Sequence, residues 1–300
     1  MIKRGRETRF EIPPQNTTTP AAYSGDPMPT VQANGVRLDY EVAGHGSTLC
    51  LIHAFPVGRG MWAPQVPAFA DRFRVIAYDC RGFGRSEAPV EPTRYSPAAS
   101  VEDARGILDA LDLGPAVACG LSMGGNIALN LALTHPESVR ALVLCDTGAG
   151  SEDPAAFRVR CEEYAQAAAG GMDAFVTASG RWSTFDEFVQ RGPAEAALFR
   201  RLTLAQPPHG IALTARFTLA PRAPVYALEA RLRALDRPTL VICGEHDHAC
   251  VEASRFLADT IPGAELWMVP GASHFPNLDA SRLFNERVLA FLREAGVDRA

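Results

Sequence analysis

The sequence lacks the features that mark several other classes of protein. It contains no run of basic residues, and its formal net charge at pH 7 is −5, which argues against a nucleic-acid partner. No apolar stretch approaches the length that a membrane-spanning helix requires. The basic residues 1–9 are followed by no apolar segment, so a secretory signal is not expected. These absences predict a soluble protein with neither a nucleic acid nor a membrane as partner.

Cysteine pairs at metal or redox spacing are also absent. The seven cysteines are odd in number, and no Cys-x-x-Cys occurs. Four of them fall in apolar runs that we expect to be buried strands: Cys50, Cys119, Cys145 and Cys243. The pattern favours reduced thiols and a cytoplasmic location. We interpret Cys119 as a small buried hydrophobe rather than a nucleophile.

The composition that is present fits one α/β domain with an insertion. The chain has 300 residues, of which 47% are hydrophobic, enough to bury a large core. Residues 1–29 are rich in proline and threonine, and we expect them to form a flexible N-terminal extension. The hydrophobic pattern changes twice after this point, which predicts a core formed by residues 30–148 and 225–300 and a separate segment, 149–224, between them.

The core segments alternate between strand and helix patterns. A hairpin with a two-residue turn is predicted at Asn34-Gly35. Short apolar runs typical of parallel strands covered on both faces follow at 49–52, 75–78, 116–119, 141–144, 240–243 and 266–269. Helices are predicted after Ser96-Pro97 and near the C-terminus, around Phe284 to Leu292. The alternation predicts a doubly wound, mostly parallel sheet whose ligand site lies beyond the carboxyl ends of its strands.

Residues 149–224 carry no strand pattern. They are rich in alanine and arginine, as expected of a helical cap inserted into the sheet domain. We interpret the aromatic residues of this segment as its own core rather than as a substrate pocket: Trp182, Phe185, Phe188, Phe199 and Phe217.

The motif Gly120-Leu121-Ser122-Met123-Gly124 carries the strongest functional signal. It lies between a predicted strand and a long apolar stretch that ends before Pro136, the context of a sharp turn from strand to helix. A serine in such a turn projects its hydroxyl above the sheet, and a β-carbon at either glycine would collide with a neighbouring element. Ser122 is therefore our candidate nucleophile.

A serine nucleophile requires a histidine base and a carboxylate that orients it, in the order serine, acid, histidine. Asp247 follows one predicted strand and His274 follows the next, so both lie at the carboxyl edge of the sheet. Glu245 competes with Asp247 for the role of acid. A metal site at His246, Asp247 and His248 is a further alternative, which we disfavour because no third partner lies at helical spacing.

An oxyanion hole is predicted from two backbone amides. One belongs to Met123, at the start of the helix after the serine, and the other to Phe55, in the loop after an early strand. We interpret His53 as a residue that hydrogen-bonds this loop. The run 79–86 lacks the glycine pattern and the lysine of phosphate loops, and we interpret it as a tight loop anchored by Asp79 and Arg81.

Together these motifs resemble the α/β-hydrolase superfamily over residues 30–292. The segments that carry the resemblance are His53-Ala54-Phe55-Pro56, Asp79-x-Arg81-Gly82-x-Gly84-x-Ser86, Gly120 to Gly125, Gly244-x-x-Asp247 and Gly271-x-x-His274. Gly120 to Gly125 and Gln206-Pro207-Pro208-His209-Gly210 are most similar to 3-oxoadipate enol-lactonases and carboxylesterases, with similarity also to meta-cleavage-product hydrolases. The resemblance implies an α/β-hydrolase fold with a mobile cap over the pocket.

The expected function is hydrolysis of small carboxylic esters or lactones through an acyl-enzyme on Ser122, with neither a metal nor an organic cofactor. Two alternatives remain. One is C–C bond hydrolysis of meta-cleavage-type diketones by the same triad, and the other is a low-turnover ligand-binding protein on a hydrolase scaffold. The expected partner is a small-molecule ester or lactone, and the sequence carries no signal for an oligomeric state.

Overall fold

The computed structural model describes residues 29–298. The predicted N-terminal extension therefore lies outside the described residues, except for Pro29. Seven cysteines are buried without disulfide bonds, which agrees with the expectation of reduced thiols. In the described part of the chain, no helix combines the length and the apolar character needed to cross a membrane.

A single eight-stranded sheet forms the centre of the molecule, in the order β1-β2-β4-β3-β5-β6-β7-β8. The first strand pairs antiparallel with the second and the second with β4, and all other neighbours are parallel. The strands are β1 (Thr30–Ala33), β2 (Val36–Ala43), β3 (Thr48–Ile52), β4 (Arg74–Tyr78), β5 (Ala116–Leu121), β6 (Val139–Cys145), β7 (Thr239–Gly244) and β8 (Glu265–Val269). The prediction of a doubly wound, mostly parallel sheet is confirmed.

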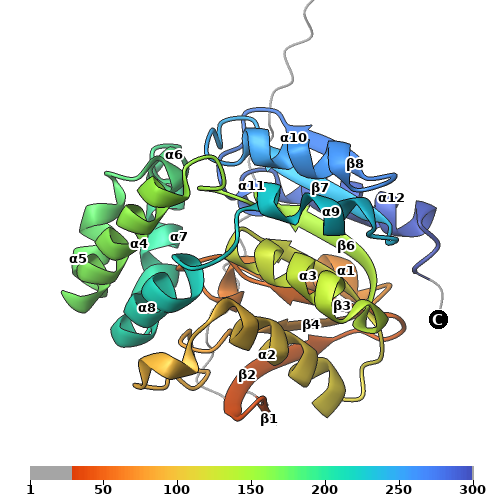
Figure 1. Ribbon diagram of the computed structural model, residues 1–300, viewed down its shortest axis with the longest axis horizontal. Helices are drawn as coiled ribbons and strands as arrows, with labels where there is room; N and C mark the ends of the chain where they lie inside the picture. The colour runs from red at the N-terminus through yellow and green to blue at the C-terminus, as the bar shows by residue number, and fades with distance from the viewer. Residues whose placement is uncertain (1–28, 299–300) are drawn as a thin grey trace, which may run out of the picture.

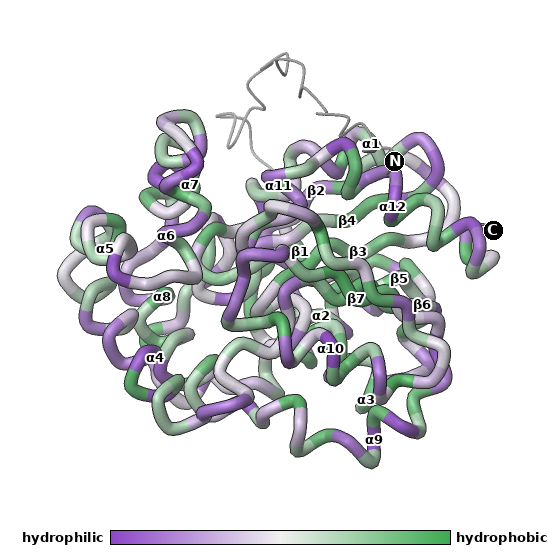
Figure 2. The backbone as a smooth tube through the Cα atoms, turned by 90° about the horizontal axis from the view of Figure 1, so that it is seen from above, coloured by the Kyte–Doolittle hydropathy of each residue, from purple (hydrophilic) through white to green (hydrophobic). Residues whose placement is uncertain are grey.

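Helices cover both faces of this sheet (Figure 1). The view from above shows two of them, α1 (Val66–Ala70) and α12 (Ser281–Glu294), on one side of the strands (Figure 2). The other side carries α2 (Pro97–Ala110), α3 (Met123–Thr134), α9 (Glu229–Arg233) and α10 (Val251–Thr260). A short helix, α11 (Pro276–Asp279), precedes α12. Burial on both faces explains why β3, β5 and β7 carry no polar side chain apart from a threonine at the start of β3 and of β7.

Two local predictions are confirmed by backbone geometry. Asn34 and Gly35 have φ values of 48° and 73°, as a two-residue hairpin turn requires, and Ala33 pairs with Val36 across it. The hydroxyl of Ser96 accepts a hydrogen bond of 3.0 Å from the Ala99 amide and caps α2. The expectation that the strand at 266–269 is covered on both faces is wrong in part, because β8 is an edge strand and Leu266 is 38% exposed.

A helical layer stands beside the carboxyl ends of the strands, at the left of Figures 1 and 2. It lies within the predicted cap segment and consists of α4 (Pro154–Ala169), α5 (Met172–Ser179), α6 (Ser183–Val189), α7 (Pro193–Leu204), α8 (Pro208–Thr214) and the π-helical turn η4 (Ala215–Leu219). Four of its five predicted core aromatics are at most 3% exposed, whereas Phe217 is 37% exposed. Phe217 contradicts the interpretation, because η4 turns it outward, and Phe185 contradicts it in part, because it also lines a cavity together with Ser122.

Candidate active site

Ser122 stands at the sharp turn between β5 and α3. Its backbone has φ 56° and ψ −109°, a conformation that residues with a β-carbon rarely adopt. The Ser122 amide is held by the Cys145 carbonyl at 2.8 Å, and its carbonyl accepts the Asn126 side chain at 3.1 Å. A β-carbon at Gly124 would collide with the Ile52 carbonyl oxygen. The turn is therefore strained and tightly packed, as its glycines suggest.

His274 and Asp247 meet between the loops that follow β8 and β7, and His274 lines a cavity together with Ser122. The Asp247 Oδ2 atom lies 2.6 Å from His274 Nδ1, and both side chains are almost completely buried. Burial alone would raise the pKa of Asp247, but the adjacent His274 and its hydrogen bond lower that pKa below its ordinary value. The other ring nitrogen, His274 Nε2, has no hydrogen-bond partner among residues 29–298. That nitrogen is the one that a proton-transfer role requires.

The competing carboxylate, Glu245, serves a different contact. Its side chain is exposed, and its Oε2 atom accepts a hydrogen bond of 2.8 Å from the Gly271 amide. His246 and His248 are also exposed. Among the described residues, two groups have potential metal-ligand atoms close together: one is Asp247, Cys250 and His274, and the other is Asp146, Cys243 and Asp247. Neither His246 nor His248 belongs to either group. Of the candidate acids, the structure brings only Asp247 to His274.

Asp146 is a buried carboxyl group that the sequence analysis missed. It follows β6 directly, its Oδ1 atom accepts the Gly244 amide at 2.9 Å, and one of its oxygens lies within 4.8 Å of an Asp247 oxygen. Burial and the neighbouring Asp247 carboxylate raise the pKa of Asp146 well above its ordinary value. The sequence signal that could have identified Asp146 is its position as a charged residue directly after the apolar strand that ends at Cys145.

The loop after β3 carries Phe55, which lines a cavity together with Ser122. Neither the Phe55 amide nor the Met123 amide donates a hydrogen bond to an acceptor within the described ranges. His53 lies behind the loop, where its Nε2 accepts the Cys80 amide at 2.9 Å and its Nδ1 donates to the Ala54 carbonyl at 2.9 Å. Burial lowers the pKa of His53, which keeps it neutral. Two amides thus remain free at the site while His53 supports the loop.

The predicted loop at 79–86 is anchored as expected. Asp79 Oδ1 accepts the Arg59 amide at 2.9 Å, and its Oδ2 atom accepts the Arg85 amide at 3.3 Å. Arg81 forms a bidentate pair with buried Asp103, through Nε to Oδ2 at 2.6 Å and through the second nitrogen to Oδ1 at 2.5 Å. The arginine is engaged within the fold and does not face the serine.

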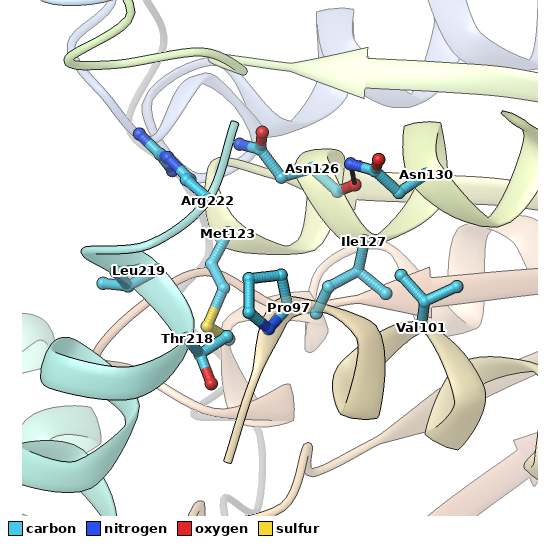
Figure 3. A pocket seen from close by; sticks show the side chains of 9 residues that line it. All are labelled: Pro97, Val101, Met123, Asn126, Ile127, Asn130, Thr218, Leu219 and Arg222. Atoms are coloured by element: carbon cyan, nitrogen blue, oxygen red, sulfur yellow. Dashed lines mark hydrogen bonds between the residues drawn. The ribbon is translucent and has the colours of Figure 1, made fainter. Parts of the chain in front are cut away.

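Two narrow cavities lie near the turn at Ser122, one lined by Ser122 itself and the other by its neighbour Met123. The first, which we call the Ser122 cavity, is lined by Phe55, Ser122, Ala149, Phe157, Tyr164, Thr184, Phe185, Leu219, Arg222 and His274. The second, the α3 cavity, is lined by Pro97, Val101, Met123, Asn126, Ile127, Asn130, Thr218, Leu219 and Arg222 (Figure 3). Each has a volume of about 30 Å³, room for one or two water molecules. Residues of the predicted core and of the predicted cap therefore line the same largely apolar cavities.

A family model described as alpha/beta hydrolase fold matches residues 47–188. The chain is 34% identical to 2-hydroxymuconate semialdehyde hydrolase from Pseudomonas sp. (strain CF600), over 88% of this chain and 93% of that protein. It is 31% identical to the putative 2-succinyl-6-hydroxy-2,4-cyclohexadiene-1-carboxylate synthase from Bacillus subtilis (strain 168), over 87% and 96% of the two chains.

A solved structure is similar over most of the chain. The crystal structure of the enol-lactonase from Burkholderia xenovorans LB400 has a TM-score of 0.75 and 31% sequence identity, and it covers 88% of this chain and 100% of that one. The sequence motifs, the sheet order and these similarities all point to one superfamily.

Proposed function

The chain belongs to the α/β-hydrolase superfamily and is a hydrolase, and on this premise we propose that it cleaves small carboxylic esters or lactones with Ser122 as nucleophile. The observation that carries the proposal is the pairing of Asp247 with His274 at 2.6 Å, in a histidine that lines the same cavity as Ser122 and whose Nε2 atom has no hydrogen-bond partner among residues 29–298. A buried carboxylate, an oriented imidazole and a serine hydroxyl are the parts that acyl transfer requires.

In the proposed mechanism, His274 Nε2 accepts the proton of Ser122 while the serine oxygen attacks the carbonyl carbon. The negative Asp247 stabilises the imidazolium that forms, and it holds the proton on Nδ1 so that Nε2 is free to accept. The tetrahedral intermediate collapses, and His274 returns the proton to the leaving alcohol. A water molecule, activated by the same imidazole, then hydrolyses the acyl-enzyme and restores Ser122.

The amides of Phe55 and Met123 would bind the oxyanion of both tetrahedral intermediates. Each such donor contributes about 3 kcal/mol to the transition state in related sites. The start of α3 adds the positive end of its dipole at Met123. Because the Ser122 cavity is narrow, an ester enters only if the side chains of the segment 149–224, the proposed cap, move aside.

C–C bond hydrolysis is the second candidate. The relative that favours it is the 34% identical 2-hydroxymuconate semialdehyde hydrolase. The same three residues would serve that reaction, so product analysis with a vinylogous diketone separates it from ester hydrolysis.

The direct test is turnover of short-chain p-nitrophenyl esters and a small lactone panel by the wild type and by Ser122→Ala. We expect the substitution to reduce turnover at least about 1000-fold. Ser183→Ala, an exposed serine at the start of α6, is the matched control and should retain wild-type activity. Equal activity of Ser122→Ala and the wild type, at equal thermal stability, would refute the nucleophile assignment.

A further inference from the structure

His274 lies in a short loop between β8 and α11, residues 270–275, which we call the base loop. On the core side this loop packs against the end of β7, where a β-carbon at Gly244 would collide with the Ser273 carbonyl oxygen. In the proposed mechanism His274 transfers protons, so the position of its imidazole depends on how firmly the base loop is held from its other sides.

Arg191, in the connection between α6 and α7, reaches the base loop from the proposed cap. Its Nη1 atom donates a hydrogen bond of 2.5 Å to the Gly271 carbonyl, and its Nε atom lies 2.8 Å from the Oδ1 atom of Asp279 in α11. These partners precede and follow His274 in the chain, so one guanidinium spans the base loop. The sequence analysis assigned Arg191 no role, and the proposed mechanism does not use it.

Asp279 connects this contact to the residues on either side of His274. Its Oδ2 atom accepts two hydrogen bonds from Ser273, one from the amide at 2.6 Å and one from the hydroxyl at 2.7 Å. The Ser273 hydroxyl in turn accepts a hydrogen bond of 3.4 Å from the Phe275 amide. The backbone before and after His274 is therefore tied to a single carboxylate.

The Asp279 carboxylate depends on Arg191 for its counter-charge. Its side chain is 1% exposed, and no other basic side chain of residues 29–298 forms an ion pair with it. Burial raises the pKa of Asp279, whereas the hydrogen bonds from Ser273 and the charge of Arg191 act in the opposite direction. Without the guanidinium, a buried carboxyl group would lack a cation, which favours its protonation or its movement toward water. Either change would weaken the hydrogen bonds to Ser273.

A second contact between the proposed cap and the base loop is apolar. The rings of Phe188 in α6 and Phe199 in α7 lie with their centroids 5.2 Å and 6.4 Å from that of Phe275, the residue after His274. Apolar contacts are not directional, whereas a hydrogen-bonded ion pair fixes a geometry. The aromatic rings therefore hold the base loop against the proposed cap, and Arg191 sets its orientation.

We propose that Arg191 is a positioning residue for His274, which acts through Asp279 to fix the base loop while the proposed cap lies on the core. This inference rests on the proposed function, in which His274 accepts the proton of Ser122. A displacement of about 1 Å at a catalytic group can cost about 100-fold in rate, so a loosened base loop has a measurable effect. The proposed cap thereby contributes to proton transfer without touching the substrate.

The first test measures kcat, KM and the thermal midpoint of Arg191→Gln with p-nitrophenyl acetate. Because Arg191 acts on the base and not on the substrate, kcat should fall about 10- to 100-fold while KM changes less than about threefold. Arg191→Lys keeps a positive charge beside Asp279 and should recover most of the lost kcat. Arg200→Gln is the matched control, since this arginine of α7 pairs with Asp173 within the proposed cap, and its kcat should equal that of the wild type.

A double-mutant cycle tests whether Arg191 acts through Asp279. Asp279→Asn alone should lower kcat to a similar extent, and the double variant should lie within about twofold of the slower single variant. Losses that multiply in the double variant, or a kcat of Arg191→Gln within twofold of the wild type, would overturn the inference. If Arg191→Gln does not fold, Asp279→Asn decides, because a kcat within twofold of the wild type there has the same meaning.

Failure of the proposed function has a different signature, since Ser122→Ala would then hydrolyse the ester as fast as the wild type. The inference is in that case tested without turnover, by the low-field proton NMR signal of the hydrogen bond between His274 Nδ1 and Asp247, identified by its absence in His274→Gln. Broadening or loss of this signal in Arg191→Gln, but not in Arg200→Gln, supports the inference. A signal in Arg191→Gln that equals the wild type, or a wild type without the signal, overturns it.

Discussion

Replacing Asp247 with asparagine tests the proposed triad at its most buried contact. The substitution keeps the shape of the side chain and removes its charge. Asp247 and His274 are at most 3% exposed, and their contact of 2.6 Å places the charge centres about 4 Å apart when the imidazole is protonated. At an effective dielectric constant of about 20, that attraction is about 4 kcal/mol, equivalent to about 1000-fold in rate. An amide that donates to Nδ1 would also move the proton to Nε2, which deepens the loss.

We therefore expect kcat on p-nitrophenyl acetate to fall about 1000- to 10,000-fold in Asp247→Asn. The measurement compares kcat and the thermal midpoint, so that loss of activity is separated from loss of folding. Glu245→Gln is the control, because it removes an exposed carboxylate two residues away and leaves an oxygen to accept the Gly271 amide. Its kcat should stay within about threefold of the wild type. A loss below tenfold in Asp247→Asn, or an equal loss in Glu245→Gln, would refute the reasoning.

Two further predictions concern stability. Gly124→Ala should lower the free energy of unfolding by about 3 kcal/mol, and with it the thermal midpoint, because the new β-carbon would collide with the Ile52 backbone. Gly180→Ala is the control: its new β-carbon would lie 3.7 Å from the nearest atom, so its thermal midpoint should change little. Equal thermal midpoints of the two variants would contradict this prediction. The pKa of Asp146 is higher in the folded state than its value of about 4 in the unfolded chain. Between these two pKa values the folded state binds more protons than the unfolded state, so the free energy of unfolding falls as the pH rises. Asp146→Asn removes this loss, and its thermal midpoint relative to the wild type should rise from pH 4 to pH 8; a constant difference would argue against a protonated Asp146.

The sheet was predictable because its signal is local. A parallel strand buried on both faces must be apolar at every position, and that pattern can be recognised in β3, β5 and β7 without knowledge of their neighbours. The exposure of Leu266 depends instead on β8 being last in the strand order, which no local pattern contains. Phe217 is similar, since a π-helical turn changes which side of the helix faces inward.

The same distinction between local and three-dimensional signals applies to the candidate site. Ser122 was identified from a motif whose glycines are required by short-range sterics, and Asp247 and His274 from their places after consecutive strands. The features of Asp146 and Arg222 could not be recognised in the sequence, because they depend on the residues that surround them in the folded chain. Asp146 lies close to a second buried carboxyl group, and Arg222 contacts the Ala149 carbonyl and the Phe157 ring. Charge balance within a pocket is a property of the folded chain and has no counterpart in sequence spacing.

Gln206 connects the proposed cap to the loop that carries Phe55. This side chain is 3% exposed, its Oε1 accepts the Gly84 amide at 2.8 Å, and its Nε2 donates to the Val57 carbonyl at 3.3 Å. A β-carbon at Gly58 would lie only 2.9 Å from Gln206 Nε2, so the glycine makes this close approach possible. Because an oxyanion donor must be fixed before charge develops, contacts that hold the Phe55 loop would, in the proposed mechanism, act on the transition state without touching substrate. The segment 206–210 that resembles enol-lactonases therefore joins the proposed cap to the proposed oxyanion hole.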